Sequence, residues 1–406
     1  MPDPSLPVLD PTTLAQGSVA PGVSGLGAVE LEAWFRERGE PAFRARQVLD
    51  AVWRTGAAAP GAISTLSPGL RAALAADLRW DTMSTTELVV SDGGRTEKAL
   101  HRLHDGVAIE SVLMHYPGGT DRRERNTLCI SSQAGCAVAC PFCATGELGF
   151  GRNLETAEIL DQVRHAARRL EAKGRRLTNV VFMGMGEPLL NLDRVLEAVA
   201  ALNDPARLGL GARHITVSTS GVVPGIHRLT ALGPQFTLAV SLHAARDPLR
   251  DVLVPLNRRW PVAEVVAAAR AHADVTGRRI SYEVTMIAGV NDTEQDAEAM
   301  AELLRGSLCH VNLIPMNPVA HTPWSASPMP VIEQFAERLG ADGIPVTIRR
   351  NRGQEIGAAC GQLAADRAGA APAAAVSRRR ELLEASSAAA LRGERSDAGV
   401  PAGVDV

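Results

Sequence analysis

Apolar and polar positions follow a regular rhythm along most of the chain. From residue 126 onward, short apolar runs alternate with longer segments in which apolar residues recur every three or four positions. The short runs predict strands at Thr127–Ser131, Asn179–Met183, His214–Ser218, Thr237–Leu242, Ser281–Ile287 and His310–Pro315. The longer segments predict helices at Thr156–Ala172, Leu192–Leu202, Gly225–Ala231, Val262–Ala273, Thr293–Arg305 and Val331–Leu339. Such alternation is typical of an α/β fold with a parallel sheet and right-handed crossovers.

The segments on either side of this alternation show other patterns. Residues 28–80 carry apolar residues at helical spacing and predict a small helical domain that could bind RNA. Residues 81–125 hold short alternating runs around a Gly-Gly turn, which predict a small antiparallel β extension. Residues 1–27 and 367–406 are compositionally biased without periodicity, so we expect a disordered leader and a flexible tail. The main domain then spans residues 126–366, as a partial barrel of six β/α units rather than a closed one of eight.

Composition and charge refine this picture only slightly. The 406 residues are 46% hydrophobic, which suffices for one large α/β domain with smaller additions. We expect a cytoplasmic protein, because no apolar stretch reaches the roughly 18 residues of a membrane helix and no signal-peptide pattern opens the chain. The net charge of −3 argues mildly against a nucleic-acid partner. Local basic clusters at 121–125, 164–176 and 349–352 could nevertheless contact a phosphate backbone, or form solvated faces.

Three of the six cysteines lie in one loop directly after the first predicted barrel strand. Cys136, Cys140 and Cys143 have C-x3-C-x2-C spacing, and three converging thiolates suit a soft metal centre. A structural zinc site would need a fourth ligand, which the loop does not supply. A cubane iron–sulfur cluster held by three thiolates leaves one iron open to a small chelating molecule. Buried core cysteines, or zinc with a remote ligand, are the alternatives.

Polar signatures follow four of the predicted strands. They comprise Met183–Pro188 with two glycines and a carboxylate, Ser218–Gly221, Ser241–Ala244 and Asn312–Pro318. In parallel barrels the chemistry gathers at the carboxyl ends of the strands. Each signature alone is weak, because Gly-rich and Ser-rich turns often do no more than turn corners. Together with the cysteine loop they predict a single site.

These motifs resemble the RlmN/Cfr family of radical S-adenosylmethionine (SAM) adenosine methyltransferases. The matching strings are GCAVACPFC, GMGEP, STSG, SLHA, NLIPMNP and AACGQL. The resemblance covers about residues 28–366 and implies a partial (β/α)6 radical SAM barrel, a [4Fe–4S] cluster and two SAM molecules per turnover. It implies that Cys136, Cys140 and Cys143 hold the cluster. The implied SAM site consists of Gly186, Glu187, Ser218, Ser241, Leu242, His243 and Asn317.

The resemblance also implies three catalytic residues outside the cluster loop. Carbon 2 of adenine lies between two ring nitrogens and is too electron-poor to attack the methyl of SAM, so the cofactor must carry the hard step. Cys360 would carry the methyl group, Cys129 would attack its sulfur to form a transient disulfide, and Glu110 would accept a proton. From the residues alone, Cys360 could be a surface cysteine, Glu110 an outward-facing strand residue and His243 a structural histidine. Cys309 is expected to pack in the core.

The implied substrate is RNA. The likeness, which includes the N-terminal Gly39–Arg44 segment, is greater to the branch that methylates carbon 2 of an adenosine in 23S rRNA, often also in tRNA, than to the carbon-8 (Cfr) branch. The target adenosine must be splayed out to expose its edge. An electron donor such as flavodoxin or ferredoxin is implied, and we expect a monomer. The alternatives from other classes are a non-catalytic, zinc-stabilised RNA-binding module and a radical SAM activase of glycyl-radical proteins.

Overall fold

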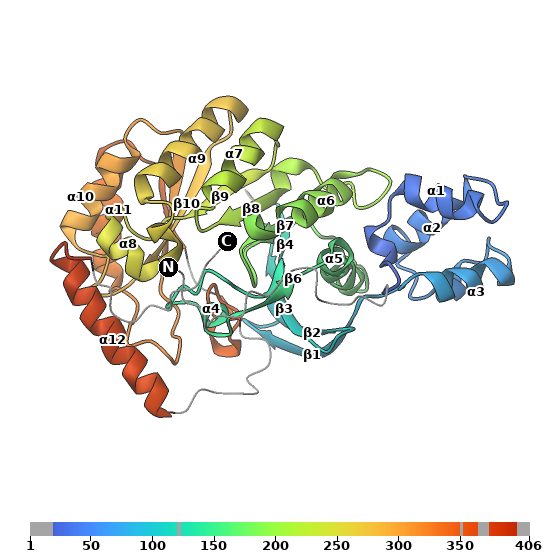
Figure 1. The fold of residues 1–406 in the computed structure, drawn as a ribbon, viewed down its shortest axis with the longest axis horizontal. Coiled ribbons are helices and arrows are strands. Elements are labelled where there is room, and N and C mark those ends of the chain that lie inside the picture. The colour runs from blue at the N-terminus through green and yellow to red at the C-terminus, as the bar shows by residue number, and fades with distance from the viewer. Residues whose placement is uncertain (1–18, 120–122, 350–351, 364–372, 396–406) are drawn as a thin grey trace, which may run out of the picture.

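The computed structural model places one continuous sheet at the centre of the molecule (Figure 1). Its strand order is β1-β2-β3-β4-β7-β8-β9-β10-β11-β12. The parallel strands are β4 (Arg125–Cys129), β7 (Asn179–Phe182), β8 (Ile215–Thr219), β9 (Thr237–Ser241), β10 (Ile280–Met286), β11 (Cys309–Pro315) and β12 (Val346–Ile348). Because β1 and β12 lie at opposite ends of this order, the barrel is open, and the predicted partial parallel barrel is confirmed. The structure describes residues 19–119, 123–349, 352–363 and 373–395.

Helices connect the parallel strands and cover the outside of the barrel (Figure 1). Strands such as β7 and β10 read as apolar runs because both of their faces are covered; Val180 and Val284 are fully buried. The connecting helices are α4 (Ala144–Glu147), α5 (Thr156–Glu171), α6 (Leu192–Asn203), α7 (Val223–Leu232), α8 (Asp247–Leu253), α9 (Val262–Thr276), α10 (Glu294–Leu304) and α11 (Met329–Ala341). In the described part of the chain, no helix is both long enough and apolar enough to cross a membrane.

The N-terminal helices have a core of their own and project from the barrel in Figure 1. They are α1 (Ala28–Arg36), α2 (Arg44–Trp53) and α3 (Pro68–Asp77), packed around buried Leu31, Phe35 and Leu74. Residues 19–27, which the sequence assigns to a disordered leader, are ordered instead. Val23 is buried, and its backbone N–H donates to the carbonyl of Arg79 at 2.9 Å. Residues 1–18 of that leader lie outside the described residues.

The β extension is part of the barrel sheet. Its strands β1 (Met83–Ser91), β2 (Thr96–Leu103) and β3 (Ala108–Tyr116) are antiparallel, and β3 pairs with β4. The sequence did not predict β2, because its buried positions include charged and polar side chains. Glu97 pairs with Arg169 of α5, and His101 contacts Ser111 of β3 at 2.8 Å. The extension therefore continues the barrel sheet rather than forming a separate sheet.

A C-terminal helix occupies part of the segment in which the sequence predicts a flexible tail. Helix α12 (Ala373–Leu391) packs on α8, with Leu383 and Ala390 buried. Arg379 pairs with Glu147 of α4, next to the cysteine loop. Small Ala and Ser side chains make this contact instead of an apolar stripe, and for this reason the sequence pattern did not show it. Residues 364–372 and 396–406 lie outside the described residues.

Candidate active site

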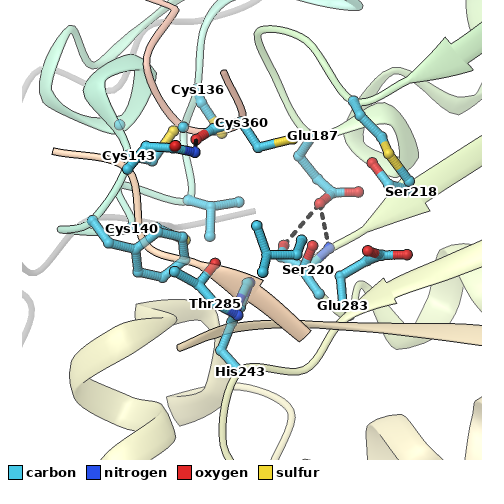
Figure 2. A pocket seen from close by; sticks show the side chains of 18 of the residues that line it. Cys136, Cys140, Cys143, Glu187, Ser218, Ser220, His243, Glu283, Thr285 and Cys360 are labelled. Atoms are coloured by element: carbon cyan, nitrogen blue, oxygen red, sulfur yellow. Dashed lines mark hydrogen bonds between the residues drawn. The ribbon is translucent and has the colours of Figure 1, made fainter. Parts of the chain in front are cut away.

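The three loop cysteines line one cavity of about 160 Å³ at the carboxyl ends of the parallel strands (Figure 2). The cysteine loop connects two short strands that follow β4 and pair with each other, β5 (Gln133–Gly135) and β6 (Phe150–Asn153). Gly135 has a φ of +77°, and a Cβ there would collide with the carbonyl of Gly149. This close approach lets the N–H of Cys136 donate to that carbonyl at 2.8 Å. The hairpin thereby fixes the first cysteine at the cavity wall.

The arrangement of these thiols fits an iron–sulfur cluster better than a single metal ion. In the described ranges, no three His, Cys, Asp or Glu side chains are grouped tightly enough to hold one ion. Ligands of a zinc ion would crowd together, each about 2.3 Å from the metal, whereas cluster ligands bind separate irons. Burial raises the pKa of all three thiols, that of Cys136 to about 12, and the neighbouring thiols add to the effect. A positively charged centre would favour their thiolate forms.

Glu187 is a buried carboxylate held beside the cysteine loop. Its Oε2 accepts hydrogen bonds from the N–H and Oγ of Ser220, at 2.7 and 2.8 Å, and its Oε1 accepts one from the N–H of Leu189. Gly186, with a φ of +100°, permits this approach, since a Cβ there would collide with Gln133. Burial raises the pKa of Glu187, and these hydrogen bonds oppose that rise by favouring the charged form. The site suits an ammonium group.

The other residues of the expected SAM site lie around the same cavity, with one exception. Ser218, Ser241, His243 and Asn317 line it with Gly186 and Glu187, whereas the side chain of Leu242 is fully buried in the core. His243 has a φ of +59°, and its Nδ1 accepts from the N–H of Thr285 at 3.1 Å. Burial lowers the pKa of His243 to about 3. The imidazole is therefore neutral and acts as an acceptor towards the β10 backbone.

Arg250 is a residue of this site that the sequence reasoning missed. It lies on α8, is fully buried, and donates to the carbonyls of Ser220 at 2.6 Å and Leu242 at 3.0 Å. Asn257 Oδ1 accepts a further hydrogen bond at 2.8 Å. Arg250 thus ties the ends of β8 and β9 together under the cavity. The signal in the sequence is weak, because Arg250 stands beside Asp251 in a short segment that also begins with Asp247.

A second cavity, of about 120 Å³, lies between the two cysteines expected to be catalytic. Cys129, at the end of β4, is buried, and that burial raises its pKa to about 12. Cys360 is exposed and lines both cavities. Its loop is held by the backbone: Asn317 donates to the Cys360 carbonyl at 2.9 Å, and the N–H of Ala144 donates to the Gly361 carbonyl at 2.6 Å. The Cys360 thiol, which should carry the methyl group, therefore lies between the two cavities.

The disulfide that the resemblance implies is not present in this structure. All six cysteines are free thiols, including Cys129 and Cys360. Cys129 belongs to a buried strand and Cys360 to a loop, and both line the second cavity. Cys309, expected to pack in the core, is 3% exposed at the start of β11.

Glu110 lies beside the second cavity without lining either one. It is buried on β3, and Lys98 Nζ is 2.9 Å from its Oε1. Strand alternation places Glu110 on the same side of β3 as Val112 and Met114, which do line the second cavity. Its charge is thus balanced by Lys98, and Glu110 lies two residues before Val112 in the cavity wall.

The basic clusters seen in the sequence have different roles. Within α5, Arg164 pairs with Asp161, whereas Arg169 of α5 and Lys173, which follows the helix, pair with Glu97 of β2. Arg169 and Lys173 thus hold the end of α5 to β2, and the charges of all three basic side chains are paired. Arg125 and Arg352 instead both stack on the ring of Tyr116, with their guanidinium carbons 4.1 and 4.3 Å from its centroid. Tyr116 and Arg352 line the second cavity.

An open parallel barrel with a three-cysteine loop after its first strand defines the class of radical SAM enzymes. Residues 130–304 match the model of the radical SAM superfamily. The crystal structure of a radical SAM methyltransferase from Sphaerobacter thermophilus is similar to this chain with a TM-score of 0.81 and 47% identity, covering 85% of this chain and 100% of that one. The chain belongs to the RlmN family, as its curated relatives show. The relative from Saccharopolyspora erythraea is 50% identical over 85% of this chain and 94% of its own length. The one from Corynebacterium glutamicum is 48% identical over 82% and 90%. Both are named probable dual-specificity RNA methyltransferase RlmN. The resemblance seen in the motifs is therefore confirmed.

Proposed function

We propose that this protein methylates carbon 2 of an adenosine in 23S rRNA, and in tRNA as well, by way of a methylated Cys360. The observation that carries the proposal is the position of Cys360 between two cavities, one lined by the three loop cysteines and the other by Cys129. We assign the [4Fe–4S] cluster to Cys136, Cys140 and Cys143. Two SAM molecules per turnover, a flavodoxin or ferredoxin donor, a monomeric state and a cytoplasmic location belong to the same proposal. SAM would contact Gly186, Glu187, Ser218, Ser241, Leu242 (through its backbone), His243 and Asn317.

The side chains around the second cavity would complete the reaction. When bound, the cluster and SAM supply the methyl group and the one-electron chemistry that no side chain can perform. Cys360 carries the carbon to the base on its Sγ. Attack by the Cys129 thiolate on that sulfur forms an S–S bond and breaks the S–C bond, and the released carbon keeps the electron pair and takes a proton to become the methyl group. Glu110 accepts the proton that leaves carbon 2.

The decisive test is the position of the new methyl group. The reconstituted, reduced protein should convert adenosine in a 23S rRNA fragment and in tRNA to 2-methyladenosine, as measured by mass spectrometry of the nucleosides. A Cys309→Ala variant should do the same, because that thiol lies outside both cavities. 8-Methyladenosine would assign the protein to the carbon-8 reaction. A colourless protein that holds one zinc ion and leaves the RNA unchanged would support a non-catalytic RNA-binding module.

The stack of Arg125, Tyr116 and Arg352 supports an RNA substrate. In the described part of the chain, no carboxylate lies within 4.0 Å of either guanidinium nitrogen group. Arg352 donates to the carbonyl of His115 at 3.0 Å and so remains fixed beside the cavity. A guanidinium that stacks on a ring keeps in-plane N–H donors for phosphate. We assign this stack to the phosphates that flank the target adenosine.

Removing one of these charges should change how RNA binding depends on salt. Arg125→Gln and Arg352→Gln are each expected to lower the slope of log K against log salt concentration by about 0.7–0.9, the contribution of one phosphate contact. Arg305→Gln is the matched control, because Arg305 is 64% exposed at the end of α10 and pairs with Asp342. Filter binding from 50 to 300 mM salt measures the slopes. Unchanged slopes for both stack variants would remove the stack from the RNA interface.

A further inference from the structure

Glu283 is a buried carboxylate in the first cavity that the motifs did not indicate. It lies on β10, is 6% exposed, and lines the cavity together with Ser218 and Ser241. Figure 2 shows it across the cavity from the loop cysteines. Register pairing places Glu283 opposite Ser241 of β9 and Asn312 of β11, so these side chains share the inner face of the barrel.

The two oxygens of this carboxylate have different surroundings. Oε1 accepts hydrogen bonds from Ser281 Oγ and Asn312 Nδ2, both at 2.8 Å. Oε2 is buried, and no described residue donates a hydrogen bond to it. The closest cation is Arg349, whose Nη1 is 3.8 Å away, beyond hydrogen-bonding distance. One oxygen is therefore oriented by the protein while the other is left as a buried acceptor.

A buried acceptor without a donor is costly, and such an atom in a cavity wall points to a ligand that donates to it. The cavity runs from the loop cysteines past Glu187, where the amino-acid end of SAM belongs, to Ser218, Ser241 and Glu283. The nucleoside end must then lie against this second group. A carboxylate only accepts hydrogen bonds, and the vicinal hydroxyls of a ribose present two donors side by side.

We infer that Glu283 is a SAM-binding residue whose free oxygen accepts hydrogen bonds from the ribose hydroxyls. This inference rests on the proposed function, because it takes SAM as the ligand of the first cavity. Ser281 and Asn312 orient the carboxylate through their hydrogen bonds to Oε1. Glu283 would then set the position of the ribose, and with it the position of the adjoining 5′ carbon, relative to the cysteine loop and Cys360.

The test is a binding cycle that requires no turnover. Anaerobic calorimetry on the cluster-loaded protein compares S-adenosylhomocysteine with its 2′-deoxy and 3′-deoxy analogues. Glu283→Ala should weaken binding of S-adenosylhomocysteine about 10- to 100-fold, the effect of losing a hydrogen bond to a charged group. The same substitution should change the affinity for at least one deoxy analogue by less than about 2-fold, because that ligand already lacks the donor. Visible absorbance of the cluster should be unchanged.

Other outcomes would overturn the inference. Equal weakening for all three ligands would show that the effect of Glu283 does not depend on the ribose hydroxyls, as expected if Glu283 supports the wall or Arg349 or contacts the adenine instead. If Glu283→Ala does not fold, Ser281→Ala and the wild-type affinities keep the inference testable. Wild-type protein that binds the deoxy analogues as tightly as S-adenosylhomocysteine would contradict it. Tight binding without RNA methylation would contradict the proposed function alone.

Discussion

Replacing Cys129 by alanine is expected to trap the protein on its RNA. Cys129 is the buried thiol that shares the second cavity with Cys360, and its proposed task is to break the bond between Cys360 and the methylated base. Without that thiol, the Cys360 sulfur should stay joined to the RNA through a methylene group. Denaturing gels should show a protein–RNA adduct, its mass should place the link on Cys360, and free 2-methyladenosine should fall below detection.

Cys360→Ala should give the opposite result, with neither adduct nor methylated product. The three loop cysteines remain in that variant, so slow cleavage of SAM should persist and report an intact cluster site. The double variant should behave like Cys360→Ala, and Cys309→Ala should turn over normally. An adduct in Cys360→Ala, or full turnover by Cys129→Ala, would show that these two thiols are assigned wrongly.

Replacing Arg250 by methionine is expected to lower stability and SAM-site affinity together. The guanidinium is fully buried and holds the carbonyls of Ser220 and Leu242, which would be left without a donor. Losing a buried charged partner of this kind costs about 3–5 kcal/mol. For a chain of this size the midpoint of thermal unfolding should fall by about 4–6 °C. Affinity for S-adenosylhomocysteine should fall as well, because β8 and β9 would no longer be tied at their ends.

Arg270→Met is the matched control for this prediction. Arg270 also donates from a partly buried position to a backbone carbonyl, that of Leu303 at 2.5 Å, but it lies outside both site cavities. That variant should lose stability without losing affinity for S-adenosylhomocysteine. Arg250→Lys should not restore the wild-type affinity, since an ammonium cannot reproduce the planar fork that reaches both carbonyls. Full affinity in Arg250→Met would mean that the carbonyl ties do not shape the site.

The barrel was readable from sequence because its strands are covered on both faces. Such strands need continuous apolar runs, and the predicted and observed strands agree to within one or two residues, as at Asn179–Phe182. Strand β2 was not readable, since its buried Glu97 and His101 are satisfied by partners from other elements. Helix α12 was missed for a similar reason, because small residues such as Ala390 become buried only through contact with α8.

The residues of the candidate site were likewise predictable from the sequence only in part. The cysteine spacing and the strand-end motifs are local in sequence, and most of their residues do line the first cavity. Leu242 is the exception, because adjacent residues point in opposite directions and its side chain turns to the core. Arg250 and Glu283 escaped notice because their roles depend on partners far along the chain. Arg250 reaches Ser220 across 30 residues, and Glu283 is held by Asn312 across 29.

The anchoring of the Cys360 loop has a consequence for the timing of the reaction. The carbonyls of Cys360 and Gly361 are both tied down, so the main chain on either side of the thiol is fixed while its side chain is exposed. The freedom left to the sulfur is torsional, about the Cα–Cβ bond, among staggered positions about 120° apart. Exposed side chains make such rotations in picoseconds to nanoseconds, against typical turnover of about 1–10³ per second. Movement of the Cys360 sulfur from one cavity to the other would then be a fast pre-equilibrium that does not limit the overall rate.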